Sequence, residues 1–438
     1  MRQNIQHLET NTNISSAIEN LTQFLYQNAL KVFGKEFKVT KNNNGIYSKQ
    51  YGKPKWFDEK CYTAKQEFKK ARNVFTKNKT DETRTSFVKT RTKYNRVRQI
   101  AKRRFKLIEG QRLENIAKLQ PRKFWKSIKR CYTKPQNKDN DVNMENLYTH
   151  FNNLLGQVPE NNRTNNVEFQ DIQDNELDSK ITEQEIHRAV FNQKNGKSSG
   201  PDELTAEIIK ASYDIISPHL TSIFNRLFDN SEYPESWGLG YIVPIYKGGD
   251  SKLAQNYRGI TLNNILAKIY SQVLLNRLTS WTEKHGKISE CQFGYQKGKS
   301  TTDCIFILHS IISKVLHTGK KLYTVFIDYE KCYDKINHSY LWQKLLSENV
   351  SSKMTKAIKA MYSVVRSVIK HNHEKSNIIN SKLGVKQGDP SSSLLFMMFV
   401  NDIIASINSD IEGIFSVGEL ELFLILYADD QVLFATSP

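Results

Sequence analysis

Two adjacent acidic residues, Asp429 and Asp430, lie between apolar runs in the stretch LILYADDQVLF. A third acid, Asp328, ends the run LYTVFID, whose alternating side chains predict a β-strand that carries Asp328 at its C-terminal end. The runs on either side of ADD predict a β-hairpin with Asp429 and Asp430 at its tip. A pair of Asp residues in a turn is most often only a solvated turn, so this alternative stays open.

If the strand and the hairpin pair, the three carboxylates form a cluster whose negative charge only divalent cations would neutralise. Oxygen ligands with open coordination positions suit Mg²⁺. Two such ions, roughly 3.5–4 Å apart, can activate an attacking hydroxyl group and stabilise the leaving phosphate oxygens of an in-line displacement. The three acids therefore predict the metal chemistry of nucleotidyl transfer.

The elements that must position these acids lie in the second half of the chain. Helical and strand-like patterns alternate from residue 181 onward, which favours an α/β or α+β fold, and Thr182 and Glu185 have the spacing of a capping box at the start of this domain. Two Gly-Lys stretches do not fit a phosphate-binding loop. In the first, at Gly196-Lys197, Phe191 occupies the position of the required first glycine, and in the second, Gly294 and Gly298 are one residue too close together.

The net charge of +19 is concentrated in one region. Residues 49–134 hold 28 Lys and Arg against 7 Asp and Glu, whereas the rest of the chain holds 36 against 38. Two apolar seams with helical spacing, one from Phe57 to Phe75 and one from Phe87 to Ile108, predict a hairpin of two long basic helices in this region. A solvated charged face is the simpler alternative. A surplus of +21 instead favours contact with a polyanion such as nucleic acid.

The remaining segments carry weaker patterns. Residues 1–48 are poorly defined, and residues 135–180 are rich in Asn, Asp, Glu and Gln, which predicts a polar linker with one short helix at 144–155. The chain has no apolar run of about 18 residues and no signal peptide, so we expect an intracellular protein with no membrane partner. The five cysteines form neither a C-x-x-C pair nor a Cys/His cluster, so no zinc site is expected.

Six blocks follow one another from residue 181 to the end of the chain: KSSGPDELTAEIIK, IVPIYKGGD with NYRGITLNNILAKI, FGYQKGKSTTDCI, FIDYEKCYD, GVKQGDPSSSLLFMMFVND and LYADD. In this order and spacing they resemble the reverse transcriptase of non-LTR (LINE-type) retrotransposons. The resemblance implies an α+β right-hand polymerase in residues 181–438, with fingers and most of the palm. The basic helical hairpin of residues 49–134 also looks like the segment that joins endonuclease to polymerase in such elements.

The resemblance implies a metal site. Asp328 and Asp429 would hold two Mg²⁺ ions, for which Mn²⁺ is an alternative. Asp430 would support them, and the backbone carbonyl of Tyr329 would be a further ligand.

The resemblance also implies a nucleotide site. Lys247 and Arg258 would hold the triphosphate, and Gln387 would lie near the nucleotide as a hydrogen-bonding residue. Tyr333 would stack under the incoming sugar and exclude a 2′-hydroxyl group, so that the enzyme selects dNTPs. A buried core tyrosine is the alternative for Tyr333.

Four positions depart from the family pattern, but none of them removes a charged catalytic group: Gly259 and Ser393 replace prolines, Ser391 replaces a leucine, and Cys332 replaces an alanine. In the family the palm continues past LYADD into a helical thumb, whereas only QVLFATSP follows here. We therefore expect a C-terminally truncated fragment that also lacks the N-terminal endonuclease.

The predicted function is that of an RNA-directed DNA polymerase, which extends a DNA 3′-hydroxyl group with dNTPs on an RNA template. Priming at nicked chromosomal DNA would imply a nuclear location. One alternative is a non-catalytic, nucleic-acid-binding remnant of such an element. The other is a reverse transcriptase of the group II intron maturase type. Such a protein should carry a maturase domain after the palm, and this sequence has none there, which argues against this alternative.

Overall fold

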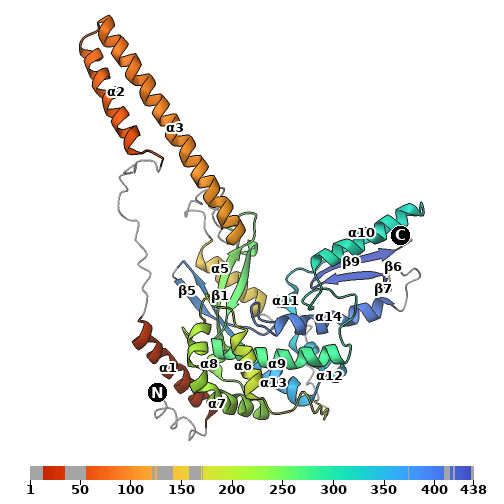
Figure 1. Cartoon of the computed structure of the whole chain (residues 1–438). Helices are drawn as coiled ribbons and strands as arrows, with labels where there is room; N and C mark the ends of the chain where they lie inside the picture. The colour runs from red at the N-terminus through yellow and green to blue at the C-terminus, as the bar shows by residue number, and fades with distance from the viewer. Residues whose placement is uncertain are drawn as a thin grey trace. The chain divides into compact units, whose positions relative to one another are not determined.

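The computed structural model describes residues 13–34, 56–120, 124–125, 142–156, 169, 171–372, 374–408, 415–417 and 420–435. The chain divides into two compact units. The core unit comprises residues 1–35 and 141–438, and the helical unit comprises residues 36–140. Figure 1 shows the elements of both units.

The helical unit consists of two helices joined by a short turn, α2 (Glu59–Lys77) and α3 (Asp81–Leu119) (Figure 1). The aromatic side chains of the two seams hold the helices together. The ring of Phe68 stacks on those of Phe87 and Tyr94, at centroid distances of 5.6 and 5.8 Å. Stacked rings of this kind add to the free energy gained by burying apolar surface.

The charged side chains of α3 lie outside this seam. Between Arg84 and Lys106 the helix carries ten Lys and Arg and no Asp or Glu. Nearly all of these basic residues are exposed, while Ala101 is buried against α2. The helical unit therefore presents a long, strongly basic surface.

The core unit mixes helices and strands, as the alternating patterns predict. Its helical elements are α1 (Ile14–Phe33), α5 (Met144–Leu155), α6 (Glu183–Phe191), α7 (Ala206–Asn230), α8 (Glu235–Gly238), the 3₁₀ helix η4 (Ala254–Asn256), α9 (Ile265–Lys284), α10 (Thr301–His317), α11 (Cys332–Lys335), α12 (His338–Ser347), α13 (Ser352–Ser363) and α14 (Ser392–Asn408). Its strands are β1 (Leu239–Tyr246), β2 (Tyr257–Leu262), β3 (Tyr323–Asp328), β4 (Arg366–His371), β5 (Glu374–Asn380), β6 (Phe415–Val417), β7 (Leu420–Leu422), β8 (Leu424–Tyr427) and β9 (Asp430–Ala435). The capping box of Thr182 and Glu185 is present at the start of α6, so that prediction is confirmed.

The strands form three sheets within the described residues. A four-stranded sheet has the order β2-β1-β4-β5, in which only β1 and β4 run parallel. A three-stranded antiparallel sheet has the order β3-β9-β8. The short strands β6 and β7 pair with each other.

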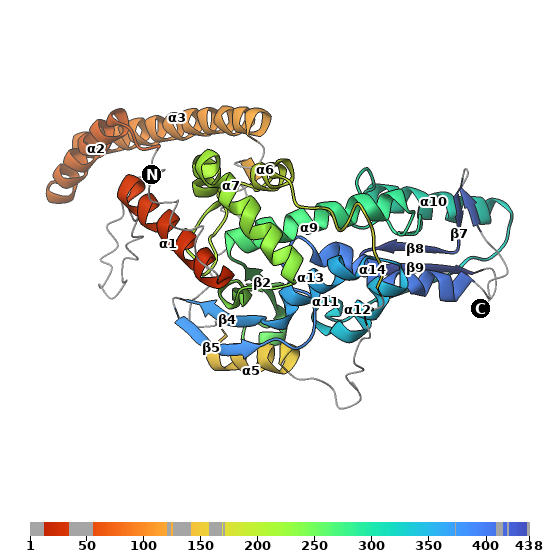
Figure 2. The same ribbon diagram turned by 90° about the horizontal axis from the view of Figure 1, so that it is seen from below.

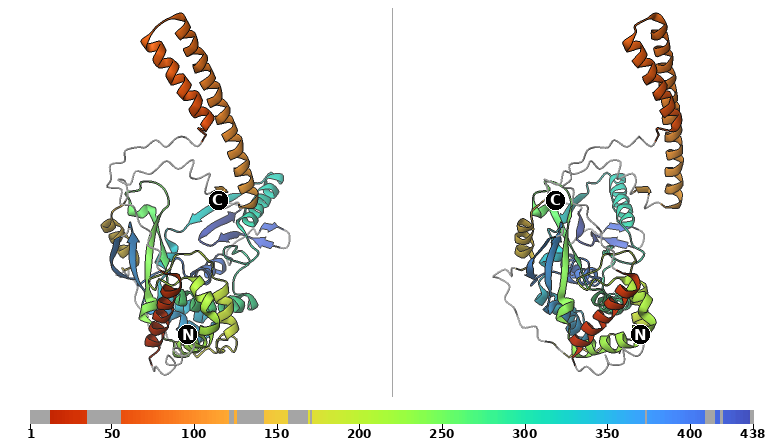
Figure 3. Two further views of the ribbon diagram at one scale, coloured as in Figure 1. Left: turned by 60° about the vertical axis from the view of Figure 1, so that its left-hand side comes forward. Right: turned by 90° about the vertical axis from the view of Figure 1, so that its left-hand side faces the viewer.

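Three apolar clusters stabilise the core unit. The largest lies among the helices, where α7, α9 and α14 contribute fully buried side chains such as Phe224, Tyr270 and Phe396 (Figure 2). A second cluster lies between α10 and the three-stranded sheet. In the third, α5 packs on the four-stranded sheet through Leu147 and Phe151, and both views of Figure 3 show α5 against this sheet.

Two segments with weak sequence patterns belong to the folded core unit. Helix α1, within residues 1–48, packs on α7 and buries Ile14, Ile18, Leu21 and Leu25 along one face. Helix α5 forms at the residues predicted for it and packs on the four-stranded sheet, although it lies within residues 135–180, whose composition predicts a linker. The polar face of such an amphipathic helix dominates its amino-acid composition, and composition alone does not reveal the tertiary contacts of its apolar face.

Candidate active site

The three predicted acids lie together at one end of the three-stranded sheet. Asp328 ends β3 and is the direct partner of Asp430, the first residue of β9, while Asp429 lies in the two-residue turn between β8 and β9. Directly opposed residues of antiparallel strands have Cβ atoms roughly 4.5–5.5 Å apart. Partial burial raises the pKa of Asp430, and the negative charges of Asp429 and Asp328 raise it further. The three carboxylates therefore repel one another.

The turn that carries Asp429 is held by a segment far away in the sequence. The side-chain Oε1 of buried Gln292 accepts hydrogen bonds from the backbone N–H groups of Ala428 (3.0 Å) and Gly294 (2.8 Å). A Cβ atom at Gly294 would lie 2.3 Å from the backbone nitrogen of Ala428, so only glycine allows this close approach. Gly294 is the first glycine of the second Gly-Lys stretch, and its position explains that glycine without a phosphate-binding loop.

A cavity of about 260 Å³ opens beside the acids. It is lined by seven of the eight residues that the resemblance assigned to the site: Lys247, Arg258, Asp328, Tyr329, Tyr333, Gln387 and Asp429. Asp430 does not line the cavity. Residues 329–333 follow β3, whereas Lys247 follows β1 and Arg258 belongs to β2. Elements of two sheets thus supply one cavity.

Hydrogen bonds join three side chains in the cavity wall. The Nε of Arg258 donates to Oε1 of Gln387 (3.1 Å), and Nε2 of Gln387 donates to Oδ2 of Asp334 (3.0 Å). Burial raises the pKa of Asp334 to about 6, although the positive charges of Lys331, Arg258 and Lys247 and the hydrogen bond from Gln387 lower it. Asp334 was not among the predicted site residues.

Sequence reasoning also missed His150 and Lys331, which line the same cavity. The Nε2 of His150, on α5, lies 3.4 Å from Nζ of Lys331. Burial lowers the pKa of His150, and the positive charge of Lys331 lowers it further, so the imidazole is neutral at pH 7 and its Nε2 can accept a hydrogen bond from the lysine ammonium. No local signal identified His150, because it lies in the segment that composition predicts to be a linker.

Tyr333 is a buried residue that also lines the cavity. Its side chain is 6% exposed and belongs to the largest apolar cluster, where its ring stacks on Phe396 at a centroid distance of 4.5 Å. Burial raises the pKa of its hydroxyl group, and Tyr295 raises it further. Tyr333 also lines the cavity, so its ring is a rigid part of the wall.

Cys332 lies beside the acids. Its Sγ is 3.5 Å from Oδ2 of Asp429, and burial together with the negative charge of Asp429 raises the pKa of the thiol to about 12. The thiol is therefore protonated and can donate to the carboxylate. The substitution of Cys332 for alanine adds no negative charge to the site.

The acids fit a divalent metal ion by their chemistry. In the part of the chain that the structure describes, no group of three or more His, Cys, Asp or Glu side chains is arranged to hold a metal ion. Mutually repelling carboxylates, however, reach a closed ligand geometry only around a cation. Clustered carboxylate oxygens are the ligands that Mg²⁺ prefers, so the donor set fits this ion.

A search of the described helices for a membrane span found none of sufficient length and apolar character.

Residues 245–438 match the family model described as reverse transcriptase (RNA-dependent DNA polymerase). One curated relative is the "uncharacterized 149 kDa protein" of transposon TX1 from Xenopus laevis, 25% identical over 260 residues, which are 59% of this chain and 20% of the relative. A second is the probable RNA-directed DNA polymerase from transposon BS of Drosophila melanogaster, 25% identical over 266 residues, or 59% of this chain and 28% of the relative.

A third relative is the Pol polyprotein from the type-1 retrotransposable element R2 of Popillia japonica, 27% identical over 58% of this chain and 34% of the relative. The chain thus spans between a fifth and about a third of the length of these relatives. Among solved structures, apo telomerase from Candida tropicalis aligns with a TM-score of 0.34 and 14% identity over 51% of this chain and 43% of that chain. The match to the family model identifies a reverse transcriptase (RNA-dependent DNA polymerase) domain in residues 245–438, and the chain is distantly similar to the polymerases of non-LTR retrotransposons.

Proposed function

We propose that the core unit extends a DNA 3′-hydroxyl group with dNTPs on an RNA template and releases pyrophosphate. The observation that carries this proposal is that residues from separate elements, chosen from the sequence, line one cavity beside the paired acids. We assign β1 and β2 to the fingers and β3, β8 and β9 to the palm of a right-hand polymerase.

In this proposal Asp328 and Asp429 hold two Mg²⁺ or Mn²⁺ ions, with Asp430 in support and the backbone carbonyl of Tyr329 as a further ligand. When bound, the ions would activate the primer hydroxyl group and stabilise the charge that develops on the leaving phosphate. Both Asp328 and Asp429 line the cavity, whereas Asp430 pairs with Asp328 across the sheet. This difference in placement matches the supporting role that we assign to Asp430.

The cavity wall also carries basic residues, and we assign them to the triphosphate. Lys247 and Arg258 are exposed residues at the end of the β1–β2 ladder: Lys247 directly follows β1, and Arg258 pairs with Ile245. Lys331 adds a third cation. Fixed positive charges stabilise phosphate oxygens most where water is partly excluded, as in a cavity of this kind.

We assign the choice of sugar to Tyr333. The ring is held against Phe396 and cannot move aside without breaking the packing of the largest apolar cluster. A rigid ring under the sugar would exclude a 2′-hydroxyl group by steric contact. Gln387 would lie near the nucleotide and hold Arg258 in place.

We propose a separate role for the helical unit, as an arm that binds the phosphates of template RNA or target DNA. The exposed basic surface of α3 motivates this proposal. Binding through phosphates releases condensed counterions and carries no sequence preference.

Primer extension tests the proposed reaction. The purified chain is given a poly(rA) template, an oligo(dT) primer and dTTP, with Mg²⁺ or Mn²⁺, and the matched control is Asp429→Asn. We expect metal-dependent extension by the unsubstituted chain and its loss in the control. If the chain shows no extension, or if Asp429→Asn leaves a trace activity unchanged, the proposal is wrong and a non-catalytic remnant that binds nucleic acid is favoured.

A further inference from the structure

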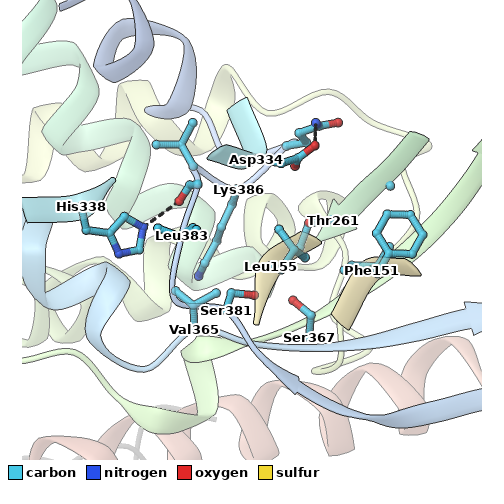
Figure 4. A pocket seen from close by; sticks show the side chains of 15 residues that line it. Phe151, Leu155, Thr261, Asp334, His338, Val365, Ser367, Ser381, Leu383 and Lys386 are labelled. Carbon is cyan, nitrogen blue, oxygen red and sulfur yellow. Dashed lines mark hydrogen bonds between the residues drawn. The ribbon is translucent and has the colours of Figure 1, made fainter. Parts of the chain in front are cut away.

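Asp334 differs from the acids at the end of the three-stranded sheet. It lies on α11, on the side of the cavity where Arg258 and Gln387 meet, and it does not belong to the pair formed by β3 and β9. Its side chain is half-buried and lines both this cavity and a second, smaller pocket, which Figure 4 shows. A carboxylate that is partly removed from water costs folding free energy, so its presence calls for an explanation.

The hydrogen bonds of Asp334 fix which way the amide of Gln387 points. An ionised carboxylate only accepts hydrogen bonds, so the amide must turn its NH₂ group toward Asp334. Its carbonyl oxygen, Oε1, then faces Arg258 and accepts from Nε. With the amide reversed, oxygen would face carboxylate and NH₂ would face guanidinium, and both contacts would be repulsive.

The backbone holds the two partners in a fixed relation. The N–H of Val385 donates to the carbonyl of Tyr333 (2.8 Å), and the N–H of Gly384 donates to the carbonyl of Ile336 (2.8 Å). On its other side, the carbonyl of Gln387 accepts from the N–H of Thr261 in β2 (2.7 Å). Asp334 and Gln387 are thus connected by the main chain as well as by their side chains.

We propose that Asp334 is a positioning residue, which orients the amide of Gln387 and through it directs Arg258 toward the triphosphate of the incoming dNTP. The inference rests on the proposed polymerase function and deepens it. Because the Nε of Arg258 is engaged by Gln387, the two terminal nitrogens of the guanidinium group remain for the ligand.

The test uses Asp334→Asn, Gln387→Ala and the double variant in the full chain. An asparagine has the same shape as aspartate, but its amide can either donate or accept, so it no longer dictates how Gln387 points. We expect Asp334→Asn to raise the KM for dTTP about tenfold, with kcat changed less than threefold, as for a group that only aligns the substrate. Because Asp334 acts through Gln387, adding Asp334→Asn to Gln387→Ala should cause no further increase in KM.

Asp202 provides the matched control for a buried carboxylate outside the cavity. Burial also raises its pKa to about 6, but its carboxylate accepts from the backbone N–H groups of Ile265 (2.9 Å) and Leu204 (3.3 Å). Asp202→Asn should leave the KM for dTTP unchanged, whatever it does to stability. A thermal melt of each variant shows whether it is folded under the assay conditions.

The outcomes separate this inference from the function on which it rests. An Asp334→Asn variant whose KM for dTTP stays within twofold of the unsubstituted chain, while Gln387→Ala raises it, overturns the role of Asp334. Effects of the two substitutions that multiply in the double variant also overturn it, since Asp334 would then act independently of Gln387. If the unsubstituted chain fails to extend the primer, or if extension survives Asp429→Asn, the proposed function fails and the inference fails with it.

Discussion

Asp334→Asn should stabilise the core unit, and the gain should depend on pH. Burial raises the pKa of Asp334 from 3.8 to about 6, even though Lys331, Arg258 and Lys247 face the carboxylate and Gln387 donates to it. A carboxyl group whose pKa is higher in the folded state holds its proton more tightly there. Its contribution therefore favours folding at low pH and is lost as the pH rises from about 4 to about 6. Asparagine does not titrate and escapes this loss.

The magnitude follows from the two pKa values. A difference of about two pH units corresponds to roughly 3 kcal/mol of folding free energy once the group is ionised in both states. About 1.4 kcal/mol of this loss falls between pH 5 and pH 7.5, because the unfolded chain is already largely ionised at pH 5 and the folded chain is not. The free energy of unfolding of Asp334→Asn, relative to that of the unsubstituted chain, should rise by about that amount over this interval.

Urea denaturation at pH 5 and pH 7.5 measures the effect, with tryptophan fluorescence as the signal. Trp237, Trp281 and Trp342 are all less than 5% exposed and report on the core unit. Comparing the two pH values cancels any constant effect of the substitution on packing. A stability difference that is the same at both pH values, or that turns against the variant at pH 7.5, would refute the reasoning.

Three further predictions address the other proposed roles. Asp429→Asn should lower kcat by at least about 100-fold in primer extension, because several kcal/mol of metal-ion stabilisation depend on it, and near-normal kcat would contradict that role. Tyr333→Val should improve the kcat/KM for UTP relative to dTTP by roughly tenfold, as expected for removing a steric block, and an unchanged ratio would leave Tyr333 as a core residue. The double charge reversal Arg96→Glu with Arg103→Glu should weaken binding of single-stranded RNA. It should also reduce the slope of log K against log salt concentration by about 1.4 or more. The charge reversal Lys320→Glu, at an exposed residue of the core unit, should do neither. Fluorescence anisotropy at several salt concentrations measures these slopes, and equal slopes for all three proteins would argue against the arm.

The acids could be predicted from local sequence because local structure places them. Alternation over LYTVFID sets the strand and its end, and the apolar runs around ADD set the hairpin. Asp328 and Asp430 then become direct partners once these two elements pair. The gathering of Lys247, Arg258 and Gln387 around the same cavity required knowledge of a family's block order, since no local pattern relates Gln387 to Arg258, 129 positions away.

The supporting residues could not be predicted, because their roles exist only in tertiary structure. Gln292 looks like any polar residue of a loop, yet its buried side chain holds the turn that carries Asp429. His150 lies on a helix whose polar composition resembles a linker, and only the burial of Phe151 and Leu147 brings it to the cavity. Asp334 lies in a predicted block, but its hydrogen bond to Gln387 spans 53 residues.

The cavity divides its charges between two sheets, and this division suits a triphosphate that carries metal ions. Asp328 and Asp429 belong to the three-stranded sheet and its hairpin, whereas Arg258 belongs to β2 and Lys247 directly follows β1. Each half is unfavourable alone, because like charges that are close together repel. Metal ions would relieve the acidic half, and phosphate oxygens would relieve the basic half. Asp334 lies on the segment that follows β3 and accepts a hydrogen bond from Gln387. Gln387 in turn accepts one from Arg258, so Asp334 links the two halves of the cavity. Burying Asp334 lowers the stability of the fold, and we interpret this loss as the consequence of keeping the charged side chains of the site in the arrangement that binds the substrate.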